Sequence, residues 1–225
     1  NKYLPTQAES FNANTDWQDE IYRTAVGTDN NFSVSGATKG LPYRLSLGYL
    51  NQNGVLKTDN FQRTTALLNL SPKFFDNHLK VDLNVNGNLS KTKFANQAAI
   101  INAVQFDPTQ EIHADNSFGN YFEWLTAAGV PNPNAPRNPM SLLETKHDQG
   151  NVKRSFGNLQ LDYSFHFLKE LRANANFGYD ISQGKGDTFV PAEAAQNAAT
   201  NGYYKEYKTD ISNKVFEFYL NYAKD

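Results

Sequence analysis

Acidic and histidine side chains gather in one short stretch, where three carboxylates and one imidazole fall within nine residues. They are Asp107, Glu111, His113 and Asp115. Hard cations such as Ca²⁺ accept oxygen ligands of this kind. Nothing in the spacing fixes a coordination geometry, so we interpret the stretch as a solvated loop. The sequence therefore predicts no metal site here.

The other residue types that serve in catalysis lack partners in the sequence. His78 and His166 fall at expected turns and His147 in an expected loop, with no arrangement typical of acid–base or nucleophilic catalysis. Residues 184–186 lack the spacing of a phosphate-binding loop, and residues 33–36 do not form a nucleophile elbow. The chain contains no cysteine, which excludes thiolate chemistry and disulfides. We predict neither an enzyme nor a cofactor.

Aromatic side chains in the long connections are better candidates for binding. Two clusters stand out: Tyr121, Phe122 and Trp124, and then Tyr203, Tyr204 and Tyr207. Large amphipathic rings suit interfaces with a ligand or a partner. The alternative is that each cluster packs only within its own loop, and the sequence leaves both possibilities open.

Long strands are the elements that must position these residues. Between Leu79 and Ser90 every odd-numbered residue is apolar or glycine, and every even-numbered residue is Lys, Asp, Asn or Ser. This period of two gives a strand one apolar face and one polar face. Twelve residues at about 3.3 Å each span roughly 40 Å. Tilted by about 45°, the strand would rise roughly 28 Å, close to the apolar band of about 25 Å on an outer-membrane barrel.

The same alternation recurs along the chain and is absent from two long stretches. We predict strands over residues 30–38, 43–52, 60–71, 79–90, 152–166, 171–182 and 213–222. A short helix is expected over 16–23, with Thr15 or Asp16 as its N-cap. A second helix is expected over 97–106, and residues 132–139 are expected to be extended because they are rich in proline.

The lengths of the connections alternate. Those over 39–42, 71–78 and 167–170 are short, whereas those over 53–59, 91–151 and 183–211 are longer. In an up-and-down meander, alternate connections lie at opposite ends, so this asymmetry is typical of outer-membrane barrels. Aromatic residues near strand ends would suit interfacial girdles. They are Tyr49, Phe74, Phe75, Phe165, Phe167 and Tyr179.

Composition agrees with this interpretation. A mean hydropathy of -0.64 and the lack of a long apolar run exclude a transmembrane helix but not a barrel. A net charge of -2 argues against nucleic acid as a partner. We predict an all-β fold, an antiparallel up-and-down transmembrane β-barrel that is partial, with about seven strands and long extracellular loops containing a short helix. Because a partial barrel of seven strands would leave backbone groups at its edges unpaired in lipid, we expect residues 1–225 to be a section of a larger barrel domain, a processed or partial piece without a signal peptide.

Four segments, in order along the first half of the chain, resemble SusC/RagA-type TonB-dependent transporters of Bacteroidetes. Residues 14–23 resemble the family's N-x-D-W-Q-D-x-[IVL]-[FY]-R segment, and residues 31–37 its N-x-S-V-S-G-G strand. Residues 47–56 are similar to its G-Y-x-x-Q-x-G-[IV] hairpin, and residues 104–109 to its x-Q-x-x-P loop. One departure is Leu67, where members often carry Arg before the pair that corresponds to Asn69-Leu70.

The resemblance implies a 22-stranded, plugged barrel in the cell outer membrane, of which residues 1–225 are expected to include neither the plug nor the TonB box. It also implies active import of glycans or peptides, energised by TonB, with a SusD-like lipoprotein over the extracellular face. This chain would supply barrel wall and extracellular loops, and the two aromatic clusters would contact the substrate or the lipoprotein lid. Two alternatives remain: a passive, porin-like outer-membrane barrel, and a soluble β-rich surface binding protein.

Overall fold

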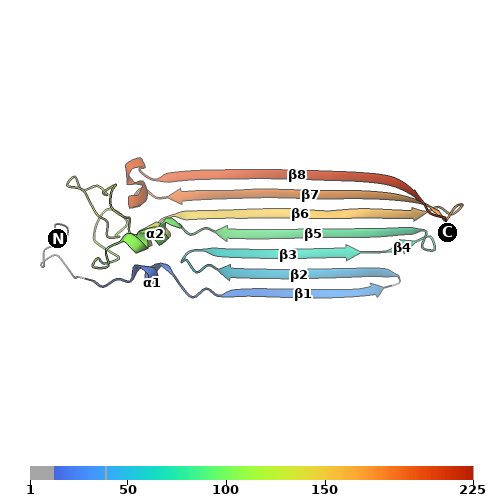
Figure 1. The fold of residues 1–225 in the computed structure, drawn as a ribbon, viewed down its shortest axis with the longest axis horizontal. Helices are drawn as coiled ribbons and strands as arrows, with labels where there is room; N and C mark the ends of the chain where they lie inside the picture. The colour runs from blue at the N-terminus through green and yellow to red at the C-terminus, as the bar shows by residue number, and fades with distance from the viewer. Residues whose placement is uncertain (1–12, 39, 225) are drawn as a thin grey trace.

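The long strands form one antiparallel sheet in a computed structural model that describes residues 13–38 and 40–224 (Figure 1). The strands are β1 (Gly27–Thr38), β2 (Leu41–Asn53), β3 (Asn60–Leu70), β5 (Leu79–Lys93), β6 (His147–Ser164), β7 (Leu171–Val190) and β8 (Tyr203–Tyr222). Their spatial order follows the sequence, and a two-residue strand, β4 (Lys73–Phe74), pairs with β5. The sheet is therefore an up-and-down meander, as predicted.

The two ends of the sheet differ in what connects the strands. The connections after β1, β3 and β6 are short and lie at one end, whereas those after β2, β5 and β7 lie at the other (Figure 1). The second group spans residues 54–59, 94–146 and 191–202 and carries the helices α2 (Ala98–Gln105) and α3 (Pro139–Glu144) and the 3₁₀ turn η1 (Ala195–Thr200). The predicted asymmetry is confirmed for the connections over 94–146 and 191–202, whereas 54–59 is shorter than 71–78 at the opposite end. The two long loops put the extracellular side at their end of the sheet.

The register aligns side chains of one type across the whole sheet, because residues paired on neighbouring antiparallel strands project to the same face. One aligned row is apolar almost throughout: Gly36, Tyr43, Leu70, Leu83, Leu159, Phe177 and Phe216. The next row, on the opposite face, contains Ser35, Arg44, Asn69, Asn84, Asn158, Gly178 and Val215. We call these the apolar face and the polar face of the sheet.

Neither face is covered by another layer within the described part of the chain. The main packing between elements joins neighbouring strands to each other and the helices to each other. Leu79, Val81, Leu83 and Val85 therefore do not pack against a second sheet, as they would in a soluble sandwich. Phe216 is 60% exposed and Phe32 66% exposed on the apolar face. A continuous bare apolar surface of this kind fits contact with lipid, since water would penalise it.

Six of the strands are longer than the hydrophobic pattern predicts, β7 and β8 most of all, and the predicted loop over 183–211 is wrong. Strand β7 continues to Val190 and β8 begins at Tyr203, so only residues 191–202 connect them. Beyond Ser182 the apolar face of β7 carries Gln183, Lys185 and Asp187 and the polar face carries Gly184 and Gly186, so the alternation of apolar and polar residues ends. This part of the hairpin extends past the apolar band, where neither face must be apolar. Backbone pairing nevertheless continues without interruption, from Leu171 with Tyr222 to Val190 with Tyr203.

The hydrophobic core lies at the end with long loops rather than on either face of the sheet. It is built from residues 13–26, 54–59 and 94–146, which we call the cap. Its buried members are Trp17, Ile21, Leu56, Ala99, Ala103, Phe106, Tyr121, Met140, Leu142 and Leu143. The first helix of the cap is α1 (Trp17–Ile21), and the carboxylate of Asp16 caps it by accepting hydrogen bonds from the amides of Gln18 and Asp19, as predicted.

Helix α2 lies within the range predicted for it, whereas α3 was not predicted and begins at Pro139, the last of the residues that we expected to be extended. The Asn138 side chain accepts from the amides of Met140 and Ser141, and Pro139 occupies the first turn of α3. Asparagine at the N-cap followed by proline is a known helix-start signal. None of the helices among residues 13–38 and 40–224 has the length and apolar composition to traverse a membrane.

Candidate functional site

Three of the four family-like segments meet in the cap, since the amide of Arg23 donates to the carbonyl of Val55 and Leu56 belongs to the core. Trp17 donates through Nε1 to the carbonyl of Asp107 at 3.0 Å, and the amide of Thr15 donates to the carbonyl of Pro108 at 2.8 Å. The ring of Trp17 also packs edge-on against Phe106, with centroids 4.7 Å apart. These contacts join the segment before β1 to the connection between β5 and β6, about 90 residues away in the chain.

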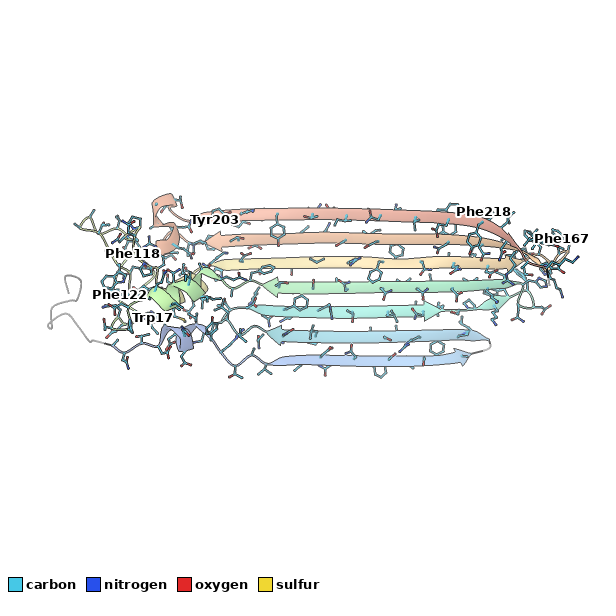
Figure 2. All side chains as sticks on the ribbon, in the orientation of Figure 1. Trp17, Phe118, Phe122, Phe167, Tyr203 and Phe218 are labelled. Atoms are coloured by element: carbon cyan, nitrogen blue, oxygen red, sulfur yellow. The ribbon has the colours of Figure 1, made fainter. Side chains whose placement is uncertain are left out.

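The first aromatic cluster extends this packing as a series of edge-to-face rings. Phe106 lies perpendicular to Phe122 with centroids 6.2 Å apart, and Phe122 lies perpendicular to Trp124 at 5.1 Å. Edge-to-face contacts contribute beyond the area that they bury. Figure 2 places Trp17, Phe118 and Phe122 together at the cap end. The series ends at Trp124, which is half-buried.

Tyr121 belongs to the interior of the cap. The side chain is 8% exposed, and its hydroxyl donates a hydrogen bond to Glu144. Burial, followed by the contact with the Glu144 carboxylate, raises the pKa of Tyr121. Because the ring is enclosed and its polar tip is already used, Tyr121 positions the loop and offers little surface to a ligand.

Asn138 organises the segments around the aromatic series. It is fully buried, and its side-chain amide donates to the carbonyl of Ile112 at 2.8 Å and to that of Phe122 at 3.1 Å. The same side chain caps α3 through its oxygen. One asparagine therefore satisfies four backbone groups from three segments, and losing it would leave them buried without partners.

Glu123 is a buried carboxyl beside Asn138. It is 5% exposed, and Oε1 accepts from the amide of Asn138 at 3.2 Å. Oε2 has no hydrogen-bond donor among the described residues, and the nearest cation, Arg137, lies 3.9 Å away. Burial raises the pKa of Glu123 to about 7, against smaller opposing effects of the Asn138 amide and Arg137. The carboxyl of Glu123 therefore has a pKa near neutral pH.

The second aromatic cluster lies on strand β8, not in a loop, which corrects the prediction. Tyr203, Tyr204 and Tyr207 are 45%, 61% and 43% exposed. By register, Tyr203 and Tyr207 project from the polar face and Tyr204 from the apolar face. The tyrosines therefore do not form a single patch. They lie toward the same end as the cap, where Figure 2 labels Tyr203.

The ring of Tyr207, on β8, lies across Gly186 of β7 and Gly150 of β6. A Cβ at Gly186 would come within 2.4 Å of the Tyr207 ring, and one at Gly150 within 2.8 Å of its hydroxyl. Both glycines are therefore required for the ring to lie flat over the polar face. The ring compensates for their missing side chains, which is a recognised device in sheets.

The acidic stretch and the histidines have structural roles. Asp107 accepts hydrogen bonds from the amide and hydroxyl of Thr109 at 2.9 and 2.8 Å. His78 stacks on His166 at the end with short turns, with centroids 3.8 Å apart, and donates through Nδ1 to the carbonyl of Ser164. Across residues 13–38 and 40–224, acidic and histidine side chains form no group of three placed to hold a metal ion.

The polar face carries cross-strand pairs that sequence reasoning missed. Arg154 makes a two-pronged pair with Asp180 at 2.9 and 2.7 Å, and Arg172 reaches Asp162 at 2.7 Å. A hydrogen-bonded series also crosses four strands, from Asn84 to Asn158, Asn176 and Glu217. The types of these residues were visible in the sequence, but their pairing depends on register. A hydrated interior suits such a face.

The geometry defines a class of protein: the wall of an outer-membrane β-barrel, with one face toward lipid, one toward a polar interior, and a packed cap at the extracellular end. The relatives agree. TonB-dependent receptor SusC of Bacteroides thetaiotaomicron is 38% identical over 229 residues, a match that covers 95% of this chain and 23% of SusC. TonB-dependent receptor P3 of Formosa agariphila is 28% identical over 94% of this chain and 21% of its own length. No protein-family profile matches the chain.

Solved structures give the same result for the fold. The RagAB peptide importer in its closed-closed state matches 98% of this chain and 25% of that chain, with a TM-score of 0.69 at 19% identity. Its open-open state matches 95% of this chain and 24% of that chain, with a TM-score of 0.72 at 20% identity.

The chain belongs to the SusC/RagA-type TonB-dependent receptors, as the family-like segments indicated. It spans about a quarter or less of the length of the relatives that it matches. The named relatives are receptors and importers rather than enzymes, which fits the expectation of no enzyme.

Proposed function

We propose that this chain forms part of the wall and the extracellular loops of an outer-membrane importer for glycans or peptides. In this proposal TonB supplies the energy and a SusD-like lipoprotein covers the extracellular end. The relatives support it, since SusC is named as TonB-dependent and RagAB as a peptide importer.

The observation that carries the proposal is the two-sided character of the single sheet together with its ordered cap. A passive pore needs the apolar and polar faces but not a packed extracellular structure. Here the 94–146 connection buries its own core and is fastened to the segment before β1. A firm, aromatic-lined extracellular surface suits capture of a ligand or docking of a lid.

Within this surface we assign contact with cargo or lid to the aromatic residues that keep a substantial part of their surface exposed. Trp124 ends the ring series of the cap, and Tyr203, Tyr204 and Tyr207 project from β8. Phe122 packs edge-on against Trp124, and the buried Tyr121 fixes the loop through its hydrogen bond to Glu144. Aromatic rings stack on sugars and fill pockets between proteins at small entropic cost. This division is a proposal about roles within the six residues selected from the sequence.

Uptake by cells that carry the complete receptor tests the proposal. The expected result is that a labelled oligosaccharide or peptide accumulates in cells with the receptor and TonB, and that deletion of TonB abolishes accumulation. Uptake that continues without TonB would favour the porin-like alternative. Extraction of the receptor from cells without detergent, as a soluble monomer, would instead favour the surface binding protein.

A further inference from the structure

The apolar face contains a hollow of about 560 Å³ near its extracellular edge. One row of aligned residues forms its floor: Ala66, Gly87, Ser155 and Ile181. A Cβ built at Gly87 would meet nothing within 4 Å, so the space above this glycine is open. Leu47 continues the row on β2. Small residues on three adjacent strands thus leave a depression between larger apolar ones.

The volume lies within the range of about 300–1,000 Å³ typical of ligand sites. The hollow opens toward lipid, so the imported cargo, which passes through the interior, does not reach it. A ligand for this surface must therefore come from the bilayer itself. An acyl chain that fills the depression would gain dispersion energy, because surface atoms without partner atoms make no van der Waals contacts.

Lysines border the hollow on its extracellular side. Lys153 lines it directly and pairs with Leu89, one row beyond Gly87. Lys91 lies in the next row outward and Lys93 in the one after, both on β5. All three are exposed, and among the described residues none forms an ion pair.

Carboxylates on the same face and at the same height lie over β7 and β8. They are Asp187, Glu206 and Asp210. Asp210 is paired with Lys208 at 2.6 Å, Glu206 accepts from the hydroxyl of Tyr204, and Asp187 accepts from the side-chain amide of Gln149. Above the hollow itself, over β5 and β6, the lysines are therefore the only charged groups that the structure describes on this face.

We propose that the hollow binds a phosphorylated lipid of the outer leaflet, with an acyl chain above Gly87 and a head-group phosphate between Lys153 and Lys91. The end with long loops faces the cell exterior, so the lysines lie at the depth of the outer-leaflet head groups. Basic side chains at a membrane surface attract anionic lipids. The inference depends on the orientation of the barrel and not on the proposed transport activity.

Native mass spectrometry of the full-length receptor in detergent tests the site, with diphosphoryl lipid A as the probe. Gly87→Leu fills the hollow, and we expect it to lower the bound fraction at least tenfold. Lys153→Gln removes one charge, and we expect about a fivefold loss, the effect of one basic residue near a charged surface. Dephosphorylated lipid A, which keeps the same acyl chains, is expected to bind the wild-type receptor as weakly as diphosphoryl lipid A binds Lys153→Gln.

Matched controls make the same chemical changes elsewhere. Ala175→Leu enlarges a residue on the apolar face outside the hollow, and Lys169→Gln removes an exposed charge at the opposite end; both are expected to bind like the wild type. Assembly is checked by the shift of the unheated band in gel electrophoresis. If Gly87→Leu does not assemble, the double variant Lys91→Gln/Lys153→Gln carries the test. Wild-type binding by an assembled Gly87→Leu or double variant, or equal binding of the dephosphorylated lipid, would overturn the proposal.

Discussion

The cap and the sheet below it are stabilised in different ways within one short chain. The cap buries Trp17, Ile21 and Leu143 almost completely, as a small soluble domain does. The sheet leaves Phe32 and Phe216 exposed and has no interior of its own. Its strands are held by backbone pairing along their whole length, and its apolar side chains are solvated by lipid. The comparison shows that the same apolar residues specify a core in one region and an outer surface in the other.

The largest effect is expected in the cap from Leu143→Ala. Leu143 is 1% exposed, and removing a buried leucine side chain costs about 2–5 kcal/mol. We expect the cap to become sensitive to limited proteolysis between residues 94 and 146 while the barrel still assembles. Phe216→Ala, which shortens an exposed residue of the sheet, serves as the control and should leave proteolysis unchanged. Loss of barrel assembly with Leu143→Ala would show that cap and sheet do not fold independently.

The complementary change in the sheet is Leu83→Arg. Leu83 lies in the middle of the apolar face, where an arginine is expected to cost about 2–4 kcal/mol in a bilayer. The measurement is the folding yield of the full-length receptor into lipid vesicles. Asn84→Arg, one residue along and on the polar face, is the matched control and should fold normally. Equal yields for the two variants would contradict the assignment of faces.

Within the cap, pH should act through Glu123. Its raised pKa means that the folded cap holds a proton that the unfolded loop releases above about pH 4.5. The free energy of unfolding of the cap is therefore expected to fall by up to about 3 kcal/mol as pH rises from about 4.5 to about 7. Above that pH it should stay constant. Glu123→Gln should remove this dependence. The measurement is the hydrogen-exchange rate of cap amides, expressed at each pH as the ratio of the wild-type rate to the Glu123→Gln rate. A ratio that does not change with pH would contradict the prediction.

The smallest effect is expected from Trp124→Ala, at the outer edge of the cap. We expect about tenfold weaker binding of the cargo or the lipoprotein lid, typical of losing an aromatic anchor, with barrel assembly preserved. Titration of the purified receptor by calorimetry measures the change. Phe167→Ala provides the control, because Phe167 is 80% exposed at the opposite end (Figure 2). Unchanged affinity in an assembled Trp124→Ala receptor would remove Trp124 from the binding surface.

Most of the strands could be predicted because alternation is a local property. From Leu79 to Ser90 the type of each residue indicates whether its face of the strand contacts lipid or water. No distant contact is needed to interpret this pattern. The prediction was wrong where the two faces of the strand no longer contact different environments. Past Ser182 the hairpin leaves the apolar band, so the pattern disappears although β7 and β8 remain paired to Val190 and Tyr203. Helix α3 was missed although Asn138 and Pro139 signalled its start.

The sequence by itself determined the two faces of the sheet, the alternation of short and long connections, and the likeness to SusC/RagA-type receptors. Only the tertiary structure decided that Tyr121 is interior, that Tyr204 and Tyr207 lie on opposite faces, and that Glu123 is enclosed beside Asn138. The physical reason is the range of the interactions. A strand's faces follow from its nearest neighbours in sequence, whereas the cap joins segments up to 95 residues apart, such as Thr15 and Gln110. Such contacts depend on register and packing that no local pattern encodes.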